Sequence, residues 1–299
     1  MSNASLGPLV RLRTLTPADI PPHPAIKPVS EHEVELYSFL KSVLDEAVAF
    51  TDSIVPATFR EGAAKASAPS SAKVKLLSRD IKASELPTSG RNESWFARRS
   101  IHKNERTGGT ADIAEFDEGL RDQHSKHEME YTPDVFDAHK VADWDDLIAV
   151  RGGDVEGRYR EVSMSVYEMC HKLPFPCLNR VFCVLVVTAK TAESSFVVVQ
   201  IPIDLSDFSD ADVLYGNGRN KRDAESALKR KKVIVGEYVS IERVTLTEDG
   251  DIQWVMATAS DAKGWLPMPM QKLGVPGAVV KDVGLFMKWT RERRGSQSQ

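Results

Sequence analysis

The second half of the chain is a series of strand-like segments that ends in one long amphipathic helix. Short polar turns at 191–193 and 247–251 join two pairs of segments, as in antiparallel hairpins. An antiparallel sheet buries one face against a second layer, and the terminal helix over about 276–293 is the available partner. The sequence therefore predicts an α+β fold. The expected strands are 136–144, 159–171, 180–190, 195–204, 232–246 and 252–260.

The first half contains fewer regular segments. Residues 1–29 are rich in proline and predict an extended arm. Ser30 and Glu33 form a capping box that predicts a helix to about Ile54. We find no convincing domain boundary after residue 55, so we expect one domain over 30–294 and a disordered tail over 295–299. The other expected elements are a loop at 61–73, strands at 74–79 and 94–102, and a charged helix at 111–130.

Composition excludes several classes of protein. The net charge of −4 supplies no field that would attract nucleic acid. The three cysteines, Cys170, Cys177 and Cys183, form neither a disulfide framework nor a CxxC zinc pair. We therefore expect no metal, no cofactor and a reducing compartment. The N-terminus lacks the pattern of a secretory signal, which predicts a cytoplasmic protein.

The end of the chain carries a recognisable pattern. Residues 260–267 read Ser-Asp-Ala-Lys-Gly-Trp-Leu-Pro and precede a helix that ends Phe286-Met287-Lys288-Trp289-Thr290-Arg291. START domains, the lipid-transfer domains related to the steroidogenic acute regulatory protein, close in a similar way. Over residues 74–294 the chain resembles a fungal branch of START-like proteins with no assigned activity. The segments that carry this second resemblance are 95–100, 131–136 and 167–176.

The resemblance implies a helix-grip fold, in which a curved antiparallel sheet wraps around a long C-terminal α-helix. Such a fold encloses a cavity for a lipid or another hydrophobic small molecule. The superfamily shares this cavity rather than a chemistry, so the resemblance supplies no catalytic residue. It implies a monomeric carrier, with the final helix as a lid and Gly284 as either a close-packing site or a hinge in that lid.

Apolar periodicity supplies candidate cavity residues. Val279, Val283, Phe286 and Met287 share one face of the final helix. Trp254 and Met256 share one face of a strand. Ordinary core packing is the alternative for all six. The candidate polar anchors, for which solvated strand ends are the alternative, are Glu168, His171, Arg180 and Gln200, with Arg180 pairing Glu168 inside the cavity.

Two polar clusters have less specific patterns. The basic residues Lys229, Arg230, Lys231 and Lys232 suit contact with an anionic membrane surface, and a solvated loop is the alternative. No aromatic residues are interleaved with them for stacking, which argues against nucleic acid. His124 and His127 lie one turn apart beside Glu128 but fail the HExxH pattern, so a solvated helix face is the favoured interpretation.

Three functions remain open at the level of sequence. The first is a carrier that binds, and transfers between membranes, one lipid or hydrophobic molecule. The second is a START-like cyclase or aromatase acting on a polyketide-like substrate, which needs Glu168, His171 or Arg180 in the cavity. The third is a membrane-docking module whose cavity is vestigial. Fold alone does not separate them.

Overall fold

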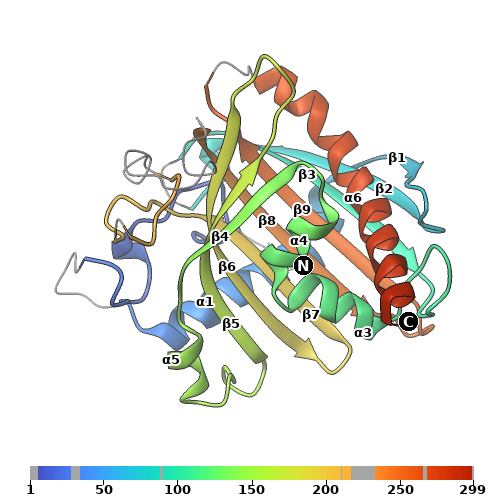
Figure 1. Cartoon of the computed structure of the whole chain (residues 1–299), viewed down its shortest axis with the longest axis horizontal. Helices are drawn as coiled ribbons and strands as arrows, with labels where there is room; N and C mark the ends of the chain where they lie inside the picture. The colour runs from blue at the N-terminus through green and yellow to red at the C-terminus, as the bar shows by residue number, and fades with distance from the viewer. Residues whose placement is uncertain are drawn as a thin grey trace.

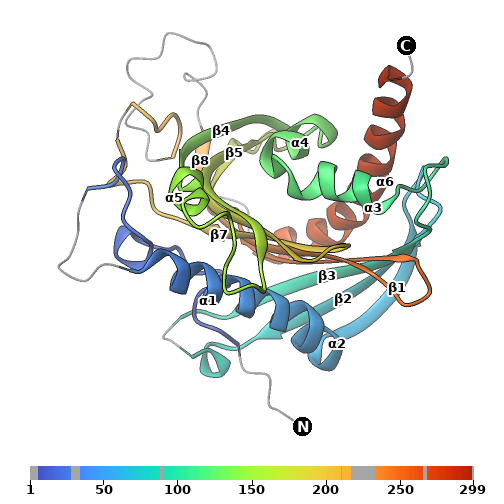
Figure 2. The same cartoon turned by 90° about the horizontal axis from the view of Figure 1, so that it is seen from below.

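The computed structural model describes residues 6–27, 34–87, 90–209, 211–216, 233–264 and 268–297. Its centre is a nine-stranded sheet with the order β1-β2-β3-β9-β8-β7-β6-β5-β4 (Figure 1). All these neighbours pair antiparallel, and the start of β8 also pairs in parallel with the start of β6. Figure 2 shows helices on both faces of this curved sheet. The strands are β1 Arg60–Ala66, β2 Lys73–Ile81, β3 Glu93–His102, β4 Val135–Asp143, β5 Arg160–His171, β6 Asn179–Ala192, β7 Ser195–Pro202, β8 Val233–Leu246 and β9 Ile252–Asp261.

The predicted strands of the second half are all present, and their ends differ from the expected ones by no more than two residues. The loop expected at 61–73 is wrong at its start, because β1 occupies Arg60–Ala66. Every residue of β1 is exposed, so the strand is held by backbone pairing with β2 at the edge of the sheet. A strand that buries no side chain leaves no alternating apolar pattern to detect.

One face of the sheet, called the outer face, is covered by α1 (Leu36–Ala49) and by the N-terminal arm. The helix continues through a π turn, η2 (Phe50–Ile54), into α2 (Val55–Thr58). Val34 and Glu35 precede α1, and the Glu35 carboxylate accepts a hydrogen bond from the backbone N–H of Ser38 at 2.7 Å. The helix thus begins later than expected, and the predicted capping box of Ser30 and Glu33 lies outside the described residues.

The arm is extended but not detached from the domain. Its side chains Leu6, Val10, Leu12, Leu15, Ile20 and Ile26 are buried in the core of the outer layer. The Glu46 carboxylate of α1 accepts hydrogen bonds from the backbone N–H groups of Leu9 and Val10, each at 2.9 Å. These contacts satisfy backbone groups that have no strand partner. Two short 3₁₀ turns, η1 (Pro17–Asp19) and η3 (Ala83–Glu85), complete the first 90 residues.

The opposite, inner face is covered by α3 (Ile113–Phe116), the π turn η4 (Asp117–Arg121), α4 (His124–Tyr131) and α6 (Met268–Gln297) (Figure 2). The single helix expected at 111–130 is interrupted at Gln123, where φ is +43° and the chain turns. A short helix, α5 (Asp145–Ala149), follows β4. The final helix begins before the expected residue 276 and contains Pro276.

Alternation along the strands divides the core into two layers. In β9, Ile252 and Trp254 belong to the inner core, whereas Ala257 and Ala259 belong to the outer core. The residues Trp265, Leu266 and Pro267 of the closing turn lie outside the described residues. Among the described residues, no helix has the length and apolar character needed to cross a membrane. The antiparallel sheet that grips a C-terminal helix confirms the predicted α+β helix-grip fold.

Candidate ligand-binding cavity

A cavity of about 200 Å³ lies between the inner face of the sheet and the N-terminal half of α6. Its roof is an apolar face of α6 formed by Val275, Ala278, Val279 and Leu285. Together with Asp282, these positions recur at the three- and four-residue spacing that places side chains on one face of a helix. The floor comes from neighbouring strands and consists of Tyr238, Met256, Thr258 and Ser260.

Polar side chains close the sides of this cavity. Glu128 and Thr132 come from α4 and the residue after it, and His171 comes from the end of β5. Asp282 reaches the cavity from α6 itself. Asp134 and Lys281 also line it, so the site combines an apolar helix face with several polar and charged groups that can orient a ligand.

A charged pair is buried beside the floor. The strand register places Arg98 and Glu242 on either side of Met256 across β3, β9 and β8. The Arg98 Nη2 atom lies 3.6 Å from Glu242 Oε2, and its guanidinium stacks 3.8 Å above the Trp254 ring. Trp254 Nε1 donates to Glu242 Oε2 at 2.7 Å. Arg98 is only 1% exposed, yet in the described part of the chain its Nε and Nη1 atoms have no hydrogen-bond partner.

Unpaired polar atoms of this kind are costly when buried. Glu128 Oε2 is a second one, since it makes no hydrogen bond within the described residues and lies 3.6 Å from His124 Nε2. A guanidinium with two free donors and a carboxyl with a free oxygen can together hold a group that accepts and donates hydrogen bonds. Glu128 lines the cavity, and Arg98 lies beside it as the strand neighbour of the floor residue Met256.

The acidic groups of the cavity have shifted pKa values. Burial, reinforced by the negative charges of Glu242 and Asp282, raises the pKa of Glu128 to about 8. Burial raises the pKa of Asp282 to about 6, although the nearby Arg98 charge acts in the opposite direction. Burial lowers the pKa of His171 to about 4. At neutral pH the cavity therefore holds a neutral His171 and a largely protonated Glu128.

A hydrogen-bonded wall ends the cavity on the side of α4. His124 is 3% exposed, and its Nδ1 donates to the Leu120 carbonyl at 2.6 Å. Its Nε2 therefore accepts from the Gln200 amide at 3.0 Å. The preference for a solvated face at His124 is thus wrong, because the chain turns at Gln123 and aims α4 at the sheet. Within the described ranges no group of His, Cys, Asp and Glu side chains is arranged to hold a metal ion.

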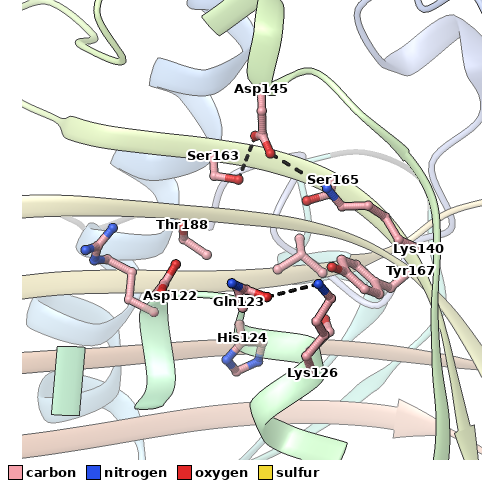
Figure 3. Close-up of a pocket in the computed structure, with 13 residues that line it drawn as sticks. Asp122, Gln123, His124, Lys126, Lys140, Asp145, Ser163, Ser165, Tyr167 and Thr188 are labelled. Carbon is pink, nitrogen blue, oxygen red and sulfur yellow. Dashed lines mark hydrogen bonds and ion pairs between the residues drawn. The ribbon is translucent and has the colours of Figure 1, made fainter. Parts of the chain in front are cut away.

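Beyond this wall is a second hollow, of about 250 Å³, which is mainly polar (Figure 3). It lies between the N-terminus of α4 and the inner face of β4, β5 and β6. Figure 3 shows Lys126, Lys140 and Tyr167 together on one side of it, with Thr188 and Asp122 on the other side. His124 lines this hollow and Glu128, one helical turn later, lines the first.

The structure separates the predicted site residues into groups. His171, Met256 and Val279 line the cavity. Gln200 lies on the inner face and holds His124. The remaining apolar candidates are packed in the inner core, where the Trp254 and Phe286 rings lie 5.4 Å apart. That packed group is Trp254, Val283, Phe286 and Met287.

Two of the polar candidates have other roles. Glu168 is fully buried, and its carboxylate accepts hydrogen bonds from the backbone N–H groups of Leu214, Tyr215 and Gly216. Arg180 donates to the carbonyls of Leu178, Ala262 and Lys263. The expected pairing of Arg180 with Glu168 is therefore wrong. Adjacent strand positions alternate faces, so Glu168 lies on the outer side, whereas His171 lies on the inner side.

Of the three residues that the enzyme hypothesis needs in the cavity, His171 is the one that lines it. The basic residues Lys229, Arg230, Lys231 and Lys232 lie outside the described residues, so their membrane contact stays a prediction. Sequence reasoning missed Arg98, Glu242 and Asp282. A charged residue at a strand or helix position that faces the protein interior was the signal that could have identified them. Arg98, which lies between Ala97 and Arg99 on β3, is an example.

The pKa of Glu128 leads to a testable prediction. Because the folded protein holds Glu128 protonated to about pH 8 while the unfolded chain ionises near 4.5, the unfolded state binds fewer protons between these values. This group therefore lowers stability as the pH rises from about 4.5 to about 8. We expect Glu128→Gln to stabilise the protein by about 2 kcal/mol at pH 8 and to have little effect at pH 4.

Urea unfolding at pH 4, 6 and 8 measures this effect. The matched control is Glu248→Gln in the exposed β8–β9 turn, which should change the free energy of unfolding by less than about 0.5 kcal/mol at each pH. A Glu128→Gln variant whose stability differs from the wild type by the same amount at every pH would refute the assignment.

Comparison with known proteins agrees with the geometry. A family model described as a protein of unknown function, DUF3074, matches residues 95–290. An uncharacterized protein from Schizosaccharomyces pombe is 25% identical over 210 residues, which cover 68% of this chain and 71% of that protein.

Two human structures have a similar fold. StAR-related lipid transfer protein 5 is 10% identical with a TM-score of 0.54, covering 86% of this chain and 97% of that one. STARD10 is 12% identical with a TM-score of 0.52, covering 84% and 82%. The predicted START-like recognition is confirmed at the level of the fold.

Proposed function

The chain belongs to the DUF3074 family of proteins of unknown function, and we propose that it binds one lipid or other hydrophobic small molecule in the cavity beneath α6. The observation that carries this proposal is an apolar helix face above unpaired buried polar groups. The similar fold of the human StAR-related lipid transfer protein 5, a lipid transfer protein by name, supports it.

The physical basis is burial of apolar surface. Each Å² removed from water contributes about 25 cal/mol, so a ligand needs no covalent step to be retained. The polar end of the ligand would meet Glu128 and the free donors of Arg98, which fix its orientation. A hydroxyl or carbonyl there would remove part of the cost of the unpaired groups.

Entry of a lipid requires the cavity to expand. Its volume of about 200 Å³ is below the roughly 300–1,000 Å³ of typical ligand pockets. The N-terminal part of α6 is suited to move, because Pro276 lacks a backbone N–H and an added Cβ at Gly274 or Gly277 would meet nothing within 4 Å. Farther along, α6 is attached to the β1–β2 turn, since Ser67 Oγ donates to the Val280 carbonyl at 2.6 Å.

Exposed apolar side chains lie at the same end of the molecule. Phe175 and Leu178 in the β5–β6 loop are 97% and 48% exposed, and Leu273 on α6 is 82% exposed. His171, which precedes the loop, and Val275 of α6 line the same cavity. Figure 1 shows the β5–β6 loop and the start of α6 at the same end of the molecule. Exposed apolar side chains of this kind support contact with a membrane. We further propose that the basic residues that precede β8 in the sequence contact anionic lipid and that the chain transfers lipid as a cytoplasmic monomer.

The binding proposal is tested by filling the cavity. Met256 is 5% exposed and forms part of the floor, so Met256→Trp should occupy the space of the ligand. We expect at least an about tenfold weaker affinity, equal to about 1.4 kcal/mol, for whichever of two probes the wild type binds. The probes are dehydroergosterol and NBD-labelled phosphatidylcholine, titrated by fluorescence.

Met129→Trp is the matched control, because Met129 lies on the solvent side of α4. Circular dichroism establishes that each variant is folded. Ala278→Trp at the cavity mouth provides a second blocking variant if Met256→Trp unfolds. Binding of neither probe by the wild type, or equal affinity in both blocking variants and the wild type, would contradict the proposal.

A further inference from the structure

The polar hollow beside α4 has features that the proposed function does not use. It is separated from the cavity beneath α6 by the hydrogen-bonded pair His124 and Gln200. Its floor is formed by hydroxyl-bearing side chains of β5 and β6 that are almost fully buried (Figure 3). Ser165 is 7% exposed and Thr188 is 6% exposed, and both line the hollow.

The N-terminus of α4 opens onto this hollow without a cap. The N-cap residue, Gln123, adopts φ +43° and ψ +38°, and its side chain makes no capping hydrogen bond. The first turn of α4 contains no acidic residue. The first backbone N–H groups of a helix have no partner within it, and the helix dipole adds positive potential at that end. An uncapped N-terminus facing a hollow is suited to an anion.

Ser125 provides an independent observation. This residue lines the hollow, is only 1% exposed, and sits in the first turn of α4. Its Oγ atom is buried and has no hydrogen-bond partner among the described residues. A buried hydroxyl without a partner is uncommon in native proteins, and it calls for a group that it can bind.

The charges around the hollow are of both signs. Arg121 is paired with Asp117 and with Glu161, and Lys140 Nζ lies 2.7 Å from Asp143. Asp145 accepts from Ser163 Oγ at 2.7 Å, and Asp122 is exposed. Lys126 Nζ donates to the Gln123 amide oxygen at 2.9 Å, and among the described residues no carboxylate pairs with it. Lys126 is thus the cation available to an incoming anion.

We propose that this hollow binds a phosphate group, presented either by a lipid head group or by a soluble phosphate compound. Its oxygens would accept from Ser125 Oγ, from the first N–H groups of α4 and from the Lys126 ammonium. Charge-assisted bonds of this kind are about twice as strong as neutral ones. The site stands on its own geometry and does not require a ligand beneath α6. His124 of this hollow and Glu128 of the cavity beneath α6 are one helical turn apart on α4.

The test compares probes with and without phosphate by calorimetry on the full chain. The probes are inorganic phosphate, dihexanoyl phosphatidic acid and dihexanoylglycerol, each at one ionic strength set with sodium chloride. We expect a phosphate probe to bind the wild type, and Ser125→Ala and Lys126→Gln to weaken it by about fivefold and about tenfold. Lys288→Gln, exposed on α6, is the matched control and should bind as the wild type does.

The Tm of the ligand-free Ser125→Ala variant distinguishes a role of Ser125 in binding from a role in folding. Because Ser125 Oγ is unpaired without ligand, Ser125→Ala should leave the Tm of the ligand-free protein unchanged or raise it. Binding of phosphatidic acid alone identifies a lipid head group as the source, and comparable binding of inorganic phosphate identifies a soluble one. Binding of neither phosphate probe, or equal affinity in Ser125→Ala, Lys126→Gln and the wild type, overturns the proposal irrespective of whether dehydroergosterol binds beneath α6.

Discussion

Replacement of Gly284 by alanine is expected to destabilise the protein by about 3 kcal/mol. An added Cβ would lie 2.4 Å from the Ala68 carbonyl oxygen and 2.8 Å from Ser67 Oγ. The first of these atoms is backbone, so α6 or the β1–β2 turn must shift. The backbone N–H of Gly284 also donates to Ser67 Oγ at 2.8 Å, and that shift would strain this bond. The gain in helix propensity, about 1 kcal/mol, is too small to offset the clash.

Gly277→Ala in the same helix is the matched control. An added Cβ there meets nothing within 4 Å, so the substitution should leave stability unchanged or raise it by up to about 1 kcal/mol. Thermal and urea unfolding of both variants measure the difference. Equal stability of the two variants would show that α6 does not approach the β1–β2 turn as described. A loss confined to Gly284→Ala makes Gly284 a close-packing site rather than a hinge.

Glu168→Ala is the second substitution with a large expected effect, also about 3 kcal/mol. The carboxylate of this buried residue accepts three backbone hydrogen bonds from residues 214–216, and two of them are 2.7 Å long. Alanine would leave these N–H groups buried without a partner. Val213 and Tyr215 of the same segment are fully buried, so the loss would also disturb the outer core.

Glu168→Gln keeps the volume of the side chain and changes its hydrogen-bonding groups, so it separates these two contributions to the free energy of unfolding. Glutamine retains one carbonyl acceptor but presents an amide N–H₂ to the remaining donors, so we expect an intermediate loss of about 1–2 kcal/mol. Urea unfolding gives the free energies, and amide hydrogen exchange reports on residues 213–216. If both variants retain affinity for the fluorescent probes while losing stability, Glu168 acts in folding. A loss of affinity without a loss of stability would instead indicate that Glu168 takes part in ligand binding.

The fold followed from the sequence because its determinants are local. The strands of the second half are long apolar segments, and short polar turns join two pairs of them, so their bounds could be predicted from the sequence pattern. The terminal helix was the apolar partner expected for one face of the sheet, and it covers the inner face, whereas α1 and the arm cover the outer face. The edge strand β1 was missed because it buries no side chain and therefore shows no apolar pattern.

The composition of the cavity was harder to predict because it depends on packing between distant elements. Glu168 and His171 are three positions apart on β5, so strand alternation alone places them on opposite faces, as it does Cys170 and His171. Glu128 has charged neighbours in sequence, yet the turn at Gln123 directs α4 inward and leaves Glu128 half-buried beside the cavity. The Arg98 and Glu242 pair is separated by 144 positions and depends on the β3–β9–β8 register.

Native mass spectrometry of the purified chain, before and after incubation with a total lipid extract and re-purification, shows whether the chain binds a ligand beneath α6. We expect a complex with one hydrophobic small molecule per chain, which is displaced on mild heating and is absent from folded Met256→Trp. A wild-type protein that remains at its ligand-free mass throughout, or a complex that folded Met256→Trp retains, would contradict it.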